Sequence, residues 1–171
     1  MEEFIIYVDK RIILVYMSVT VAALLFLRQF GSFIFSSLII SLFEGFTHYL
    51  RADLLILIKS DLPAIMHEHR TFFWYGGWVM INLCSILAVR QGHRLLQLKL
   101  GRLAIVYMFS SLLLIVLHIV GYVDTVYFEK TEMVNMFYSV GLDVLRVTVA
   151  LVMLFQLIAT IRSERIQWKT L

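Results

Sequence analysis

The chain of 171 residues is 61% hydrophobic and 16% charged, and its mean hydropathy is +0.87. Soluble domains average about 45–50% apolar and about 25% charged residues, so this composition excludes an ordinary soluble protein. The formal net charge of +3 is too small to indicate a nucleic-acid partner, and the lone cysteine, Cys84, excludes an intramolecular disulfide and a cysteine-based metal site.

Five apolar segments are long enough, or nearly long enough, to cross a hydrocarbon core of about 30 Å, which takes roughly 17–25 helical residues. These segments cover residues 11–30, 32–50, 71–89, 103–123 and about 135–161. One helix over residues 11–50 would be about 60 Å long at 1.5 Å per residue, so we expect a tight hairpin at 28–31. The first segment is short, which leaves a half-inserted or strongly tilted first helix as an alternative. The sequence therefore predicts an all-α, polytopic transmembrane helical bundle of about five spans, forming a single domain over residues 1–171.

The second segment carries small residues beside ionisable ones. Ser37, Ser41 and Gly45 recur every four residues, and such a small-residue stripe permits close helix approach. Glu44 and His48 also stand four residues apart, so they share one helix face next to the stripe. The pattern predicts helix packing here and leaves open whether the neighbouring helix belongs to the same chain or to a second copy.

The link over residues 51–70 contains a run of five apolar residues, 54–58, that is too short to span and is flanked by Asp53 and Asp61. We expect a short interfacial or re-entrant helix at the outer surface between spans two and three, with Pro63 either ending it or starting a second short turn. Aromatic residues then crowd the start of the third segment and are typical of an interfacial belt: Phe72, Phe73, Trp74, Tyr75 and Trp78.

The third segment and the link after it carry two further signals. Asn82, mid-way along the segment, is expected to hydrogen-bond across a helix interface. The link over residues 90–102 alternates leucine with basic residues and has no acidic residue, a pattern that suits contact with anionic lipid head groups. The residues expected to make that contact are Arg90, Arg94, Lys99 and Arg102.

Charge also predicts the orientation. The 90–102 link and the tail at 162–171 are both rich in Lys and Arg, and basic loops tend to stay in the cytoplasm. The N-terminus is then outside, the C-terminus inside, and nine of the twelve acidic residues fall on the outer side. We expect a multi-pass protein of the cytoplasmic membrane, most simply a bacterial inner membrane, with lipid and either other membrane subunits or copies of itself as partners.

A group of ionisable residues is expected to lie within the outer leaflet. At 1.5 Å per residue, Glu44 lies about 9 Å, His118 about 7–8 Å and Asp143 about 12 Å below the outer boundary, on three different helices. Arg146 follows Asp143 by three residues, so the two can pair. Because charges inside a membrane cost a few kcal/mol each, such groups face the protein interior or water and usually have partners.

Three interpretations of this polar cluster stay open. It can be a neutralising lock, in which Asp143 pairs with Arg146, and Glu44 pairs with His118 or His48. It can be a proton- or ion-handling site, because carboxylate and imidazole groups inside spans are what a proton relay needs. It can also pair with charges on another subunit.

Metal binding is a weaker hypothesis, and we expect no cofactor. His48 and His118 could form the axial pair of a b-type haem, although no second pair is seen on the inner side. His67 and His69 could bind zinc together with His48, but residues two apart do not share a helix face.

No phosphate-binding loop, nucleophile elbow or HExxH motif occurs in the sequence, so we do not expect an enzyme. The leading expectation is a non-enzymatic integral membrane protein that acts as a homo-oligomer or as a small subunit of a larger membrane assembly. The alternatives are a proton- or ion-translocating protein that uses the polar cluster, and a haem- or quinone-binding electron-transfer subunit.

Overall fold

The computed structural model describes residues 2–27, 31–59, 69–128 and 131–169, with side chains described for 11–27, 31–51, 69–128 and 131–163. The described residues form no strand, and nearly all of them lie in five α-helices. The helices are α1 (Glu2–Phe26), α2 (Ser32–Lys59), α4 (Arg70–Leu95), α5 (Arg102–Tyr127) and α6 (Glu132–Lys169).

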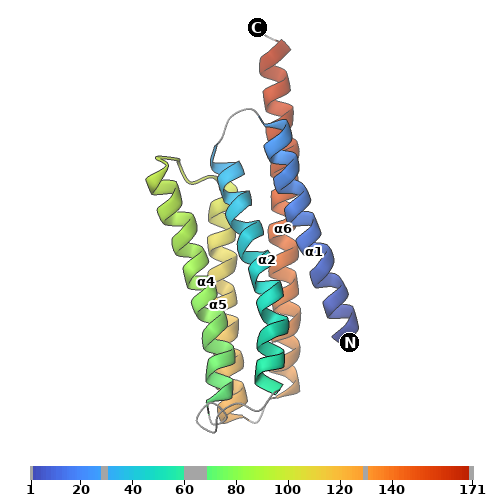
Figure 1. Ribbon diagram of the computed structural model, residues 1–171, viewed down its shortest axis with the longest axis vertical. Helices are drawn as coiled ribbons and strands as arrows, with labels where there is room; N and C mark the ends of the chain where they lie inside the picture. The colour runs from blue at the N-terminus through green and yellow to red at the C-terminus, as the bar shows by residue number, and fades with distance from the viewer. Residues whose placement is uncertain (1, 28–30, 60–68, 129–130, 170–171) are drawn as a thin grey trace.

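The helices lie side by side as an elongated bundle (Figure 1). α4 packs on α5, α5 packs on α6, and α2 contacts all three of these helices. α1 leans across α2 and α6, and its N-terminus diverges from the bundle (Figure 1). We call the end where α4 and α6 begin the Arg70 end, and the end where α5 begins the Gly101 end.

The core lies where α1, α2, α5 and α6 meet. Its most deeply buried apolar residues include Tyr16 and Ala23 of α1, Ile40 of α2, Ala104 of α5 and Met153 of α6. Alanine and serine at buried positions let the helix axes approach closely, which is how membrane helices gain packing energy. Large apolar side chains such as Leu25, Leu112 and Phe155 lie exposed on the outside, where lipid would cover them.

Four helices are long and apolar enough to cross a membrane. Their spanning parts are Ser32–Arg51, Arg70–Leu95, Arg102–Tyr127 and Glu132–Ser163. The apolar part of α1, Arg11–Phe26, is shorter. The all-α fold is confirmed, and four of the five expected segments form helices that are long and apolar enough to cross. The number of helices that do cross, and the orientation, stay predictions.

The region between α2 and α4 differs from the expectation. α2 continues to Lys59, so the apolar run at 54–58 belongs to α2 and does not form a separate helix. No proline or other strong helix breaker interrupts the sequence between Ser32 and Lys59, which explains the continuation. Asp61 and Pro63, like most of the expected hairpin at 28–31, lie outside the described residues, so the interfacial helix stays a prediction.

The turn from α4 to α5 is a Schellman motif. The N–H of Leu98 donates to the carbonyl of His93 at 2.8 Å, and the N–H of Gln97 donates to that of Arg94 at 3.2 Å. Gln97 has φ of 53°, the left-handed conformation that this motif requires and that usually selects glycine. The motif reverses the chain sharply and places the start of α5 against the start of α2.

Candidate functional site

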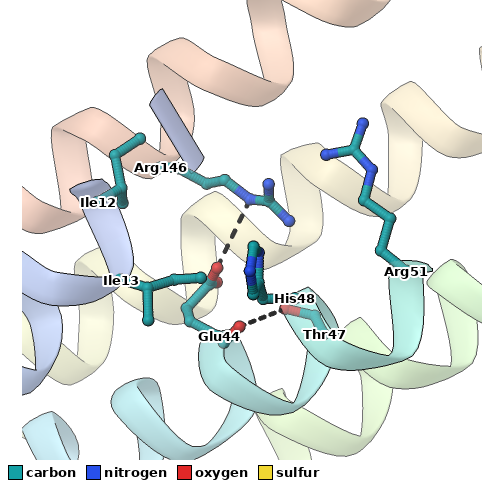
Figure 2. Close-up of a pocket in the computed structure, with 7 residues that line it drawn as sticks. All are labelled: Ile12, Ile13, Glu44, Thr47, His48, Arg51 and Arg146. Atoms are coloured by element: carbon teal, nitrogen blue, oxygen red, sulfur yellow. Dashed lines mark hydrogen bonds and ion pairs between the residues drawn. The ribbon is translucent and has the colours of Figure 1, made fainter. Parts of the chain in front are cut away.

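An ion pair joins α2 to α6 within the bundle. Arg146 Nε lies 3.5 Å from Glu44 Oε2, and the two side chains are only 18% and 12% exposed. Figure 2 shows the two side chains pointing toward each other from their helices. Opposite charges attract strongly at a buried site, because little water is present to screen them. The pair therefore ties the middle of α2 to the middle of α6.

A small cavity of about 10 Å³ adjoins this ion pair. Ile12 and Ile13 of α1 cover one side, and Thr47, His48 and Arg51 of α2 line the other (Figure 2). A volume of this size holds about one water molecule. The site is thus a nearly dry group of ionisable side chains that α1 closes off.

The sequence-predicted cluster divides into two places. His48 lines the cavity with Glu44 and Arg146, and Asp143 lies one turn before Arg146 on α6, half-buried. The contact between Arg146 and Glu44 across two helices was not predicted, because only the spacing of Asp143 and Arg146 within one helix is visible in the sequence. His118 belongs to a different cluster.

His118 lies in an aromatic cluster formed by α4, α5 and α6. Its Nδ1 atom shares a hydrogen bond of 2.8 Å with the hydroxyl of Tyr138. The Trp78 ring stacks against it at 6.2 Å between centroids, and Tyr75 lies edge-on at 6.5 Å. The expected aromatic belt is therefore split: Phe72 and Phe73 are exposed, whereas Trp78 is buried beside His118.

The small-residue stripe packs against α1 of the same chain. The hydroxyl of Thr20 lies 2.8 Å from that of Ser41 and donates to the carbonyl of Ser37 at 3.0 Å. A Cβ atom on Gly45 would lie 3.6 Å from Met17 Cε. This stripe is thus buried within the chain and is not available to a second copy.

Among the residues that the structure describes, the hydrogen bond of the Asn82 side chain stays within its own helix. Its amide nitrogen donates to the carbonyl of Trp78 at 2.8 Å, one turn earlier on α4. A short amide side chain on a helix reaches the carbonyl four residues back as readily as a neighbouring helix. Sequence position alone therefore does not decide between the two.

A buried histidine that sequence reasoning missed is His93, which is 1% exposed. The Nδ1 atom lies 2.8 Å from the carbonyl of Val89 and so donates to it, which leaves Nε2 to accept from Ser32 Oγ at 2.8 Å. Ser32 Oγ in turn accepts the N–H of Gly101 at 2.9 Å. These bonds hold α2, α4 and the start of α5 together, and with the imidazole so deeply enclosed the serine–histidine pair is best explained as structural.

Gly101 is needed for this contact, because a Cβ atom there would lie 2.7 Å from Ser32 Oγ. Ser32 and His93 stand 61 residues apart in the chain. No local pattern in the sequence relates two residues so far apart.

The basic residues of the 90–102 link are exposed at the Gly101 end: Arg90, Arg94, Lys99 and Arg102. Arg90 and Arg94 border an open groove of about 510 Å³ together with Leu98 and Leu100. Cationic side chains beside apolar ones suit the surface of an anionic bilayer. Contact with lipid head groups stays a prediction.

The described residues hold no group of three or more His, Cys, Asp or Glu that could bind a metal ion. His69 precedes α4 and is exposed, while His67 lies outside the described residues. The two histidines of the haem hypothesis, His48 and His118, line two different cavities.

Comparisons of the chain with protein-family models, with curated proteins and with solved structures find no match.

Proposed function

We propose that this chain is a non-enzymatic integral membrane protein that works as a homo-oligomer or as a small subunit of a larger membrane assembly. The observation that carries the proposal is the side chain of Gln156, a primary amide within the apolar, spanning part of α6.

Gln156 is half-buried, and its buried Oε1 atom has no hydrogen-bond partner among the described residues. An unsatisfied amide in hydrocarbon costs several kcal/mol. Glutamine in a membrane helix commonly satisfies its amide by bonding to a neighbouring helix. A rotation of the half-buried Gln156 side chain would turn Oε1 toward such a helix, and this supports the proposal.

The surface of α6 beside Gln156 leaves room for that helix. Only 22% of the apolar window of α6 is buried within the chain. Ala159 and Ser163 lie three and seven residues after Gln156, close to it on the helix surface, and both are exposed. Small residues at these positions allow a second helix to approach closely.

Disulfide cross-linking in native membranes tests this face of α6. Cys84 is the only cysteine, so a Cys84→Ser background accepts one new cysteine at a chosen place. Ala159→Cys samples the Gln156 side, and Leu154→Cys, also exposed but on the other flank of α6, is the matched control.

The proposal expects oxidation of the Ala159→Cys protein to give a product larger than the 20.0 kDa chain, and Leu154→Cys to give little or none. Adding Gln156→Leu should reduce the amount of that cross-linked product, because leucine cannot form the hydrogen bond across the interface. Equal cross-linking from both positions, or none from either, would contradict an interface on this face.

Proton transfer through Glu44 is a second candidate, and the small cavity lined by Glu44, His48 and Arg146 favours it. A water molecule there would connect a carboxylate to an imidazole, which a proton relay uses. Proton flux into liposomes tests this candidate: it requires flux in the wild type and loss of flux in a folded Glu44→Gln variant. Equal flux in the two proteins, or none in the wild type, removes it.

A further inference from the structure

Another open cavity, separate from the one beside the ion pair and from the groove at the Gly101 end, lies between the first turns of α4 and the last turns of α5, near the Arg70 end. Its volume is about 530 Å³, within the range of small-molecule sites. Gly76 and Gly77 of α4 line it, together with the rings of Tyr75, His118 and Tyr122. The ion-paired Glu44 and Arg146 line a different cavity.

The cavity opens to the outside of the bundle. Phe72, Met80 and Ile119, which stand at its edge, are 56%, 59% and 50% exposed. This part of α4 and α5 belongs to the spanning segments, so the opening faces the bilayer. No described residue that lines the cavity carries a formal charge. An occupant therefore comes from the hydrocarbon and is neutral.

The two adjacent glycines create much of the space. A Cβ atom on Gly77 would meet nothing within 4 Å, and one on Gly76 would meet only the tip of the Phe72 ring, at 3.9 Å. Glycine inside a helix costs about 1 kcal/mol relative to alanine, so a pair of them usually has a packing or functional reason. Here the bare backbone of α4 offers a flat wall on which a ring can lie.

The inner end of the cavity is polar. His118 is 5% exposed, and its Nδ1 atom is held by the Tyr138 hydroxyl at 2.8 Å. The other ring nitrogen, Nε2, has no hydrogen-bond partner among the described residues. A ring nitrogen without a partner in a membrane-spanning segment costs about 1–3 kcal/mol, which a ligand carrying a hydrogen-bonding group would recover.

We propose that this cavity binds a neutral ring amphiphile from the bilayer, of the quinone or quinol class. A carbonyl or hydroxyl group of the ring hydrogen-bonds His118 Nε2, and the ring packs between the α4 glycines and the aromatic side chains, as flat rings do. The apolar tail leaves past Met80 and Ile119 into the lipid. This site does not depend on the oligomeric function proposed above.

Binding can be measured by titrating decyl-ubiquinone into the full chain in lipid nanodiscs and following quenching of tryptophan fluorescence. Trp78 stacks on His118 and reports directly on the site. Gly77→Leu fills the cavity without meeting an existing atom at its Cβ. Cys84→Leu is the matched control, because Cys84 is exposed, lies seven residues on along the same face of α4 and does not line the cavity.

The proposal expects saturable quenching in the wild type and in Cys84→Leu, and affinity weaker by roughly tenfold in Gly77→Leu. Equal, non-saturating quenching in all three proteins would show only partitioning of the probe into lipid and would overturn the proposal.

The polar contact is tested separately. His118→Leu should also weaken binding by roughly tenfold, and decylbenzene, which has no hydrogen-bonding group, should not compete in the wild type. Efficient competition by decylbenzene would mean that apolar contacts alone fill the cavity without a hydrogen bond to His118, which contradicts the proposal. If His118→Leu fails to fold, the Gly77→Leu variant and the decylbenzene competition still test whether the cavity binds the quinone.

Discussion

At the scale of single residues, the Glu44–Arg146 ion pair is an electrostatic contact on which stability should depend. Both side chains are mostly buried and they belong to different helices. Removing one member takes the close opposite charge away from a mostly buried group, and for buried pairs such a loss costs about 3–5 kcal/mol. Removing both leaves neither charge stranded.

We therefore predict that Arg146→Gln lowers thermal stability and that the double variant Glu44→Gln/Arg146→Gln recovers much of the loss. Unfolding of the purified protein in detergent measures both, alongside Glu44→Gln. If the two single losses simply add in the double variant, the two side chains do not interact and the ion pair does not stabilise the fold.

A second prediction at this scale concerns Gln97, whose positive φ is costly for any residue with a Cβ atom. Gln97→Gly should raise stability by about 1 kcal/mol, because it removes a steric cost of about 1–2 kcal/mol and adds some chain entropy to the unfolded state. Gln91→Gly is the control: Gln91 is exposed in the last turns of α4, so glycine there should lower stability by about 1 kcal/mol. Thermal unfolding of both variants measures these changes. A loss of stability in Gln97→Gly would contradict the steric cost assigned to the positive φ of Gln97.

The sequence predicts which residues are unusual but not which ones meet. Glu44, His48 and Arg146 stand out because ionisable groups are rare inside spans, and the structure brings these three to one cavity. The contact of Arg146 with Glu44 depends on the rotation of α2 and α6 about their axes, which no local spacing encodes. For the same reason His118 was expected beside Glu44, whereas its hydrogen bond goes to Tyr138.

At the scale of helices, α1 is attached to the bundle through the small-residue stripe of α2. Thr20 bonds to Ser37 and Ser41, and Met17 lies over Gly45. Close packing of this kind tolerates little added volume. The hydroxyl of Tyr16 donates a hydrogen bond to the carbonyl of Arg146 at 2.7 Å. This bond connects α1 to α6.

We predict that Gly45→Leu destabilises the protein by about 1–3 kcal/mol, the usual cost of overpacking, because the leucine must displace α1. Gly45→Ala is the matched control and should be tolerated, since its Cβ makes an ordinary contact with Met17 at 3.6 Å. Thermal unfolding measures both. Wild-type stability of Gly45→Leu would show that α1 does not pack here.

Helix existence was predictable from the sequence because long apolar runs without proline leave few other structures possible in a membrane. The residues at which helices end were less predictable. α2 extends nine residues past the predicted end of its span at Leu50, to Lys59, because nothing in the sequence stops it there. The hydrogen bonds that join Ser32 to His93 and to Gly101 depend on the left-handed conformation of Gln97. A glycine at that position would have indicated the turn in the sequence, but glutamine does not.

At the scale of the whole molecule, the orientation follows from charge and is open to a direct test. We predict that a reporter after Leu171 is cytoplasmic, whereas reporters before Glu2 and within residues 124–132 are external. The contrast between the reporters at residues 124–132 and after Leu171 tests whether α6 crosses, and the contrast between the two termini tests whether α1 crosses. Termini on the same side would remove α1 as a span, and a loop at 124–132 on the side of Leu171 would remove the crossing of α6.

The central claim is that this chain works in an assembly, and the protein mass of the solubilised particle tests it most directly. Light scattering in a mild detergent, corrected for bound detergent, should give at least twice the 20.0 kDa of one chain, or one chain together with a second polypeptide. Gln156→Leu should shift that mass toward the single chain. A wild-type particle that contains one 20.0 kDa chain and nothing else, in detergent and in nanodiscs alike, would contradict the account.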